Sequence, residues 1–391
     1  MQRWLLRGVF LLIIVGLAGA GWRYATGTPA TQAGGTLTVA EALGGNPTAG
    51  FKRVTTPRPF VFPADHGPHP GYQTEWWYYT GNLSSADGRA WGYQLTFFRT
   101  ALTPNPQVRT SAWGADTLYM AHFALTDVAG NQFYAADRYS RDGAGLAGAQ
   151  GEPYRVWLET WSASGPDNAM RLVAAQGDVA IDLTLRNTKP AALQGDRGVS
   201  QKSAEPGNAS YYYSLTRMAT EGTFTIKGKP VAVTGASWMD REWSTSALGQ
   251  DVLGWDWFAL HLNDGRDLMF YQLRRRDGSS DPYSAGTLIA ADGSTQRLAR
   301  DDVQLETLAR WRSPGSGADY PAGWRMRIPS LGLDLTIRPY VANQELPLTV
   351  VYWEGAAAIT GTSNGAAVQG NGYVELTGYG EQRQQTAVES R

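Results

Sequence analysis

Residues 75–99 read EWWYYTGNLSSADGRAWGYQLTFFR, and residues 254–276 have a similar pattern, GWDWFALHLNDGRDLMFYQLRRR. Each stretch has an aromatic run, then Asp-Gly-Arg, then a run that carries Tyr-Gln-Leu. Asp-Gly between two such runs is the turn signal of a β-hairpin. The distance from Arg to Tyr differs by one residue, so one copy needs a bulge or an insertion. The repeat predicts a duplicated unit, two β-barrels in tandem, with the second opening near residue 245.

The rest of the chain supports an all-β fold. Short apolar and aromatic runs recur at regular spacing with turn residues between them, and no segment keeps a helical period. The 15 Trp, 19 Tyr and 11 Phe residues favour strands, and 46 Gly with 20 Pro indicate many turns. We therefore expect one β-barrel over residues 71–244 and a second over residues 245–391.

The first 26 residues are typical of an export signal. Two arginines precede an apolar run over residues 9–21, with a small-residue cleavage motif at its end. The run is short for a membrane span, although residues 5–22 could serve as an uncleaved inner-membrane anchor. Both alternatives place the remainder in the periplasm or outside the cell, with membrane contact through this segment only. Residues 27–70, rich in Thr, Ala, Gly and Pro, are expected to be a linker and entry segment.

Composition excludes several classes of function. The 34 basic and 35 acidic residues give a net charge of −1, which provides no reason to expect nucleic acid as a partner. The absence of cysteine excludes disulfides, a thiol nucleophile and a lipid-modified cysteine. Four widely spaced histidines make no metal-ligand pattern, and neither a serine nucleophile elbow nor a phosphate-binding glycine loop occurs. We expect no metal and no cofactor.

The aromatic run of the first repeat contains one acid, Glu75. In a strand, Glu75, Trp77 and Tyr79 face one side, and Trp76 and Tyr78 face the other. In one interpretation Glu75 projects into a barrel cavity, where burial raises its pKa and suits it for acid–base catalysis, while Trp77 and Tyr79 bind a ligand. In the other, Glu75 is a rim carboxylate above a packed aromatic core, which is the commoner use of such rings.

Two further residues are candidates for ligand binding. His122 lies in the middle of the apolar run TLYMAHFALTD. A histidine there either faces a cavity or is a hydrogen-bonded core residue. Trp257, in the aromatic run of the second repeat, is the second candidate.

The densest group of charges lies in GASWMDREWSTSALG, residues 235–249. In an extended strand Asp240 and Glu242 share a face about 7 Å apart, a separation suited to an acid/base pair. The alternative is a structural ion-pair cluster in which Arg241 holds both acids, because buried charges must be paired. The neighbouring Trp243 is a further candidate for ligand contact. The sequence leaves the two alternatives open.

Six motifs in order resemble the carotenoid 1,2-hydratase-like family, which includes AttH-type proteins labelled predicted secreted hydrolases. They are HPGYQTEWWYYTGNL, AHFALTD, SWMDREWS, GWDWFALHLNDGR, YWEGAAAITG and GYVELTGYG. The resemblance covers residues 60–382 and implies two lipocalin-like domains. It also implies an association with membrane export systems, so an ABC transporter is an expected partner.

The resemblance assigns residues less directly. In hydratase members, the segment matching residues 240–243 reads Asp-His-x-Trp, and its His is implicated in adding water to a polyene. Here Asp240 and Trp243 match, but Arg241 replaces the His, and a guanidinium cannot shuttle protons as imidazole does. Tyr271 matches a tyrosine of those members, but the two residues after it supply no Asp. The resemblance therefore implies the fold more directly than the reaction.

Three functions remain as hypotheses. The first is an exported protein that binds or carries a hydrophobic small molecule. The second is an enzyme that hydrates or hydrolyses an apolar, isoprenoid-like substrate, with Glu75, Asp240 or Glu242 as proton donor and with Tyr271 and His122 positioning the substrate. The third is a structural envelope module with filled barrels. A cavity reached by Glu75 or His122 would favour the first two, and the side chains that Arg241 contacts would separate binder from enzyme.

Overall fold

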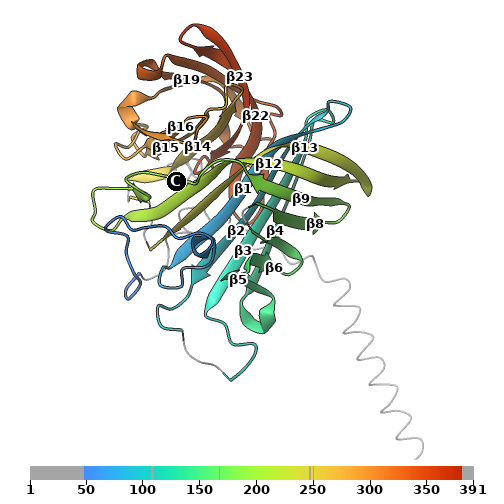
Figure 1. The fold of residues 1–391 in the computed structure, drawn as a ribbon, viewed down its shortest axis with the longest axis vertical. Coiled ribbons are helices and arrows are strands. Elements are labelled where there is room, and N and C mark those ends of the chain that lie inside the picture. Colours follow the sequence, from blue (N-terminus) through green and yellow to red (C-terminus); the bar gives the residue numbers. More distant parts are fainter. Residues whose placement is uncertain (1–47, 107–109, 167, 246–247, 250, 381–391) are drawn as a thin grey trace, which may run out of the picture. The chain divides into compact units, whose positions relative to one another are not determined.

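The computed structural model describes residues 48–106, 110–166, 168–245, 248–249 and 251–380 (Figure 1). Over these residues the chain forms two large antiparallel sheets and four single-turn 3₁₀ helices, none of them long and apolar enough to span a membrane. The predicted all-β class with two barrel-like sheets is confirmed. The predicted export or anchor segment, residues 1–26, lies outside the described residues, as does the predicted linker up to residue 47.

The first sheet is formed by the strands drawn from blue to yellow-green in Figure 1. These strands are β1 Thr74–Ser85, β2 Ala90–Ala101, β3 Thr117–Asp127, β4 Gln132–Arg141, β5 Ala147–Gly151, β6 Tyr154–Leu158, β7 Trp161–Ser164, β8 Met170–Gln176, β9 Val179–Asn187, β10 Ala192–Leu193, β11 Val199–Gln201, β12 Ala209–Ile226 and β13 Lys229–Ser244. The main path runs β4-β3-β2-β1-β13-β12-β9-β8-β7-β6-β5, so β1 pairs with both its hairpin partner β2 and the distant β13.

The second sheet follows the order β17-β16-β15-β14-β23-β22-β20-β19-β18. Its strands are β14 Val252–Leu262, β15 Asp267–Arg275, β16 Ala285–Ile289, β17 Thr295–Ala299, β18 Gln304–Arg312, β19 Asp319–Ile328, β20 Leu333–Pro339, β21 Glu345–Pro347, β22 Val351–Ser363 and β23 Ala366–Leu376. The helical turns are η1 Ala64–His66, η2 Gly143–Gly145, η3 Arg300–Asp302 and η4 Pro329–Leu331. The two predicted hairpins of the repeat are β1–β2 and β14–β15.

Each sheet curls around its own apolar core. In the first, Phe123 on β3 and Trp161 on β7 meet with ring centroids 5.7 Å apart, although these strands are not neighbours in the sheet. Trp77 and Tyr79 are fully buried in this core. In the second, Phe258 packs edge-on against Trp324. The interiors of both barrels are therefore filled by side chains.

A third apolar cluster joins the outer faces of the two sheets. Tyr78 and Trp238 contribute from the first sheet, and Trp257 and Tyr271 from the second. The rings of Tyr78 and Trp257 meet edge to face with centroids 5.1 Å apart. The aromatic strands of the two repeats thus face one another through the side that points away from each barrel core.

The unequal spacing within the repeat has a structural consequence. Tyr93 of the first copy is buried inside the first barrel, whereas Tyr271 of the second copy lies in the cluster between the sheets. A shift of one residue along a strand moves a side chain to the opposite face. The one-residue difference therefore turns Tyr271 away from the barrel core and toward the other sheet.

Candidate active site

A pocket lies between the outer faces of the two sheets. The first sheet contributes β1, β2, β3, β12 and β13, and the second contributes β14, β15, β22 and β23. Aromatic and aliphatic side chains make up most of its wall: Trp76, Tyr78, Phe98, Met120, Tyr212, Leu248, Trp255, Trp257, Tyr271, Leu273, Val350 and Tyr352. Its ionisable groups are Asp240, Glu242, Glu354, Glu375, Lys202 and His122. An apolar concave site with a few converging polar groups is the usual form of a small-molecule site.

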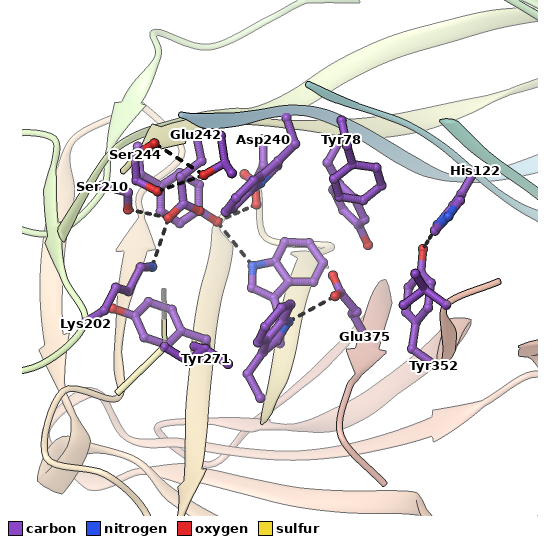
Figure 2. A pocket seen from close by; sticks show the side chains of 18 of the residues that line it. Tyr78, His122, Lys202, Ser210, Asp240, Glu242, Ser244, Tyr271, Tyr352 and Glu375 are labelled. Carbon is purple, nitrogen blue, oxygen red and sulfur yellow. Dashed lines mark hydrogen bonds and ion pairs between the residues drawn. The ribbon is translucent and has the colours of Figure 1, made fainter. Parts of the chain in front are cut away.

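One end of the pocket holds an ion pair. Figure 2 shows Lys202, Ser210 and Glu242 together at this end, next to Tyr271. The Lys202 ammonium lies 3.1 Å from a carboxylate oxygen of Glu242, which also accepts a hydrogen bond from Ser210. The same ammonium stands 4.5 Å from the ring centroid of Tyr271. Burial alone would lower the pKa of Lys202, but Glu242, Tyr271 and Asp240 together outweigh it and raise that pKa. Lys202 therefore stays charged and neutralises Glu242.

Asp240 lies next to this ion pair, on the same face of β13, and is almost completely buried. Its carboxyl accepts hydrogen bonds from Ser214 at 2.5 Å, from Trp238 at 2.7 Å and from the Tyr212 hydroxyl. Burial raises the pKa of Asp240 to about 7, despite the three donors, which lower it. A carboxyl that titrates near neutral pH can both give and take a proton there.

Glu354 on β22 and Glu375 on β23 are direct cross-strand partners in the middle of the pocket. Glu354 accepts a hydrogen bond from the Tyr78 hydroxyl at 2.9 Å, and Glu375 accepts one from the Trp255 indole at 3.0 Å. Burial raises the pKa of Glu375 to about 8, and burial together with the neighbouring Glu375 raises the pKa of Glu354 well above its usual range. Both groups hold a proton near neutral pH.

His122 and Tyr352 mark the opposite end of the pocket (Figure 2). The His122 Nδ1 atom lies 2.7 Å from the Tyr352 hydroxyl, and its Nε2 atom is buried without a hydrogen-bond partner among the described residues. Burial lowers the pKa of His122 to about 4, so the imidazole is neutral at physiological pH. A neutral ring with one nitrogen free is able to orient a polar group of a ligand.

Comparison with known proteins assigns the family. Residues 53–379 match the family described as AttH-like. The chain belongs to the AttH-like family. The crystal structure of an AttH from Nitrosomonas europaea is 34% identical to it, with a TM-score of 0.76, over 84% of this chain and 100% of that one.

More distant solved structures share the fold of this AttH-like chain. Kievitone hydratase from Nectria haematococca is 19% identical, with a TM-score of 0.62, over 84% of this chain and 96% of that one. CghA, crystallised with Sch210972, is 16% identical, with a TM-score of 0.53, over 88% and 98% of the two chains. No curated protein matches the chain.

Glu75 is buried, but the interpretation in which burial raises its pKa was wrong. Its carboxylate pairs with Arg241 and with Arg99 at 2.9 Å, and accepts the backbone N–H of His69 at 3.1 Å. Burial alone would raise the pKa of Glu75, but the two guanidiniums and His69 hold it well below its usual range. Glu75 lies outside the pocket lining, so this AttH-like chain uses it in a structural ion-pair network.

Arg241 does form a structural ion pair, but its predicted partners were wrong. Alternation along β13 turns Arg241 into the first barrel, toward Glu75, and turns Asp240 and Glu242 outward into the pocket. The position at which hydratase relatives are expected to carry a histidine therefore points away from this pocket. The two acids are free of Arg241, as an acid/base role requires.

The remaining predicted residues divide by the same alternation. Trp77, Tyr79 and Trp243 belong to the core of the first barrel, so the prediction that they line a ligand site was wrong; Trp243 stacks on His69 at 3.7 Å. Asp240, Glu242, Tyr271, His122 and Trp257 do line the pocket. Their individual roles stay predictions. Within the described residues, no group of three His, Asp or Glu side chains could hold a metal ion.

Several pocket residues were not found from the sequence. Glu354 and Glu375 lie inside two of the motifs that suggested the family, YWEGAAAITG and GYVELTGYG. The available signal was an isolated glutamate within an otherwise apolar strand. Burying a charged or polar side chain costs free energy unless it is paired, so a glutamate in such a strand is unusual. Lys202 and Tyr212 gave no comparable signal, since each depends on contacts with distant strands.

The raised pKa of Asp240 predicts a pH-dependent stability. The folded state binds the Asp240 proton more tightly than the unfolded state does, so its contribution to the free energy of unfolding is full below pH 3.8 and is lost as pH rises to about 7. The non-titrating variant Asp240→Asn lacks this loss. We expect the difference between wild type and variant to change by at most ~1.4 kcal/mol per pH unit across that window. Urea unfolding measured at several pH values checks this, and parallel pH profiles would contradict it.

Proposed function

We propose that this AttH-like protein performs acid–base chemistry on an apolar, unsaturated small molecule bound between its two barrels, with hydration of a double bond as the reaction. One observation carries the proposal: Asp240, Glu354 and Glu375 have pKa values raised to neutrality or above, in a pocket walled by aromatic rings. Perturbed carboxyls gathered in a cleft are characteristic of catalytic sites. The fold shared with kievitone hydratase is compatible with this chemistry.

Asp240 and Tyr212 are the groups we assign to proton transfer. Tyr212 donates to Asp240 and accepts the Trp257 indole N–H at 3.2 Å, so its hydroxyl connects the buried acid to the pocket. When Asp240 carries its proton, the hydrogen bond between these two residues reverses and Asp240 donates to the Tyr212 hydroxyl. The Tyr212 hydroxyl proton then moves to one carbon of the double bond while the Asp240 carboxyl proton replaces it. Water adds to the neighbouring carbon, and the proton it loses returns through Tyr212 to Asp240. The sum is the addition of one water, with the acid regenerated.

The test is isolation of the bound molecule from the full-length chain. Wild type and Asp240→Asn are purified in parallel, their small molecules are identified by mass spectrometry, and turnover is followed in isotopically labelled water. We expect the variant to retain an unsaturated molecule that wild type converts to its hydrate, with conversion slowed by at least about a hundredfold. Asp182→Asn, an exposed Asp-to-Asn change on β9, is the matched control.

A carrier for a hydrophobic small molecule is the second candidate. It is favoured by the saturation of Asp240 with three protein donors and by the ion pair of Glu242 with Lys202, which also suit groups that only shape a pocket. In that case wild type and Asp240→Asn would retain the same unaltered molecule. Export of the chain and a role beside an ABC transporter remain part of this second proposal.

A further inference from the structure

Among the side chains that the structure describes, the Glu354–Glu375 pair has no cationic group beside it, in contrast to several buried acids of this protein. Glu75, Glu242 and Asp267 each form an ion pair with a lysine or arginine. Within the described residues, neither Glu354 nor Glu375 has such a partner, although the two are directly opposed across β22 and β23. If both were ionised, the two carboxylates would repel each other across the strands. The pair therefore holds protons in the free protein, and its ionised form needs a positive charge that no lysine or arginine of the described residues supplies.

Hydrogen bonding to the pair is also incomplete. Each glutamate has one side-chain donor, Tyr78 for Glu354 and Trp255 for Glu375. The Oε1 atom of Glu354 has no partner within the described part of the chain, although Glu354 is fully buried and lines the pocket. An unpartnered buried carboxyl oxygen is costly. A donor brought in by a ligand would satisfy it.

The surroundings of the pair suit a cation more than a neutral donor. The rings of Tyr78, Trp255 and Trp257 line the same pocket, and aromatic faces attract an ammonium group when it is removed from water. The other charged groups facing the pair are Asp240 and Glu242, which add negative potential, while Lys202 is engaged by Glu242. His122 is neutral and adds no competing positive charge.

We infer that the ligand of this pocket is an apolar molecule with one protonated amine, whose ammonium group binds Glu354 and Glu375 among the rings of Tyr78, Trp255 and Trp257. The inference rests on the proposed function in that this amine is the substrate on which Asp240 acts. It narrows the substrate class and assigns Glu354 and Glu375 to recognition. In the free protein the pair holds protons, and one ammonium group offsets one negative charge, so its binding releases one proton from the pair.

The experiment compares three probes of nearly equal shape on the full-length chain: N,N-dimethylbenzylamine, its carbon isostere isobutylbenzene, and the anion phenylacetate. Binding is measured at neutral pH by tryptophan fluorescence, since three tryptophans line the pocket. We expect the amine to bind at least about tenfold more tightly than the hydrocarbon, and phenylacetate to bind more weakly than both. Calorimetry of the amine in buffers of different ionisation enthalpy should register proton release.

Variants separate this inference from the proposed reaction. Glu375→Gln and Glu354→Gln should each abolish the preference for the amine and the proton release, while isobutylbenzene still binds, which shows that the pocket is folded. Asp240→Asn should still prefer the amine and release a proton, because Glu354 and Glu375 remain, although the negative potential of Asp240 at the pair is lost. Equal affinity for amine and hydrocarbon, or a preference that survives both Glu-to-Gln changes, would overturn the inference. Unchanged turnover in Asp240→Asn would overturn the proposed reaction and leave the amine site standing.

Discussion

Replacing Arg241 with methionine is expected to lower the free energy of unfolding by about 3–5 kcal/mol, the range for breaking a buried ion pair from one side. Arg241 is fully buried and donates to Glu75 and to backbone carbonyls of Gly67 and Trp76, with its guanidinium 3.9 Å from the ring centroid of Trp77. Methionine preserves much of the packing but leaves the Glu75 carboxylate with less positive charge inside the barrel. Chemical denaturation at neutral pH measures the loss.

Two further variants make this prediction specific. Arg171→Met removes an exposed ion pair with Asp182 and should change stability by less than ~1 kcal/mol. Adding Glu75→Gln to Arg241→Met should restore part of the stability, because no uncompensated carboxylate then remains buried. If Arg241→Met unfolded at the wild-type denaturant concentration, the network around Glu75 would not be the stabilising element that we describe.

Asp267→Asn is expected to have an effect of similar size, about 3–5 kcal/mol, for a different structural reason. Asp267 begins β15 of the second sheet and is fully buried. Its carboxylate accepts Lys189 at 2.7 Å, Thr216 at 3.0 Å and Arg217 at 2.6 Å, all from the part of the chain that forms the first sheet. Asparagine keeps the volume but leaves two cations without their carboxylate at the contact between the sheets.

The control lies in the same hairpin. Asp264, three residues earlier, pairs with Arg266 of its own turn and is partly exposed, so Asp264→Asn should be nearly neutral. Both variants are unfolded with denaturant, and their affinity for the three ligand probes is measured separately. This would show whether ligand affinity falls together with the stability of the contact between the sheets. Identical unfolding midpoints for Asp267→Asn and Asp264→Asn would refute the prediction.

Much of the fold could be predicted from the sequence because its signals are local. The Asp-Gly turns at residues 87–88 and 264–265 predicted two hairpins, and their repetition predicted two sheets. Alternation along β1 also separated Trp77 from Trp76 correctly. Alternation did not show whether the ligand site lies on the face toward the barrel interior or on the outer face. The sequence favoured an aromatic barrel interior, but both interiors are packed, and the pocket lies on the faces that point outward.

The site could be predicted only where one strand carried the information. Asp240 and Glu242 share a face because they are two residues apart, which is a property of any strand. The partner of Arg241 could not be found in this way, since Glu75 lies 166 residues away and meets it only because β13 pairs with β1.

The sequence by itself determined the repeat, the strand character of the chain and the two faces of each strand, because these depend on backbone geometry and on neighbours within a few residues. Only the tertiary structure decided that the outer faces of the two sheets meet, and that Asp240, Glu354 and Glu375 share one pocket. The physical reason is that burial, and with it the pKa of each carboxyl, depends on which distant strands exclude water from it.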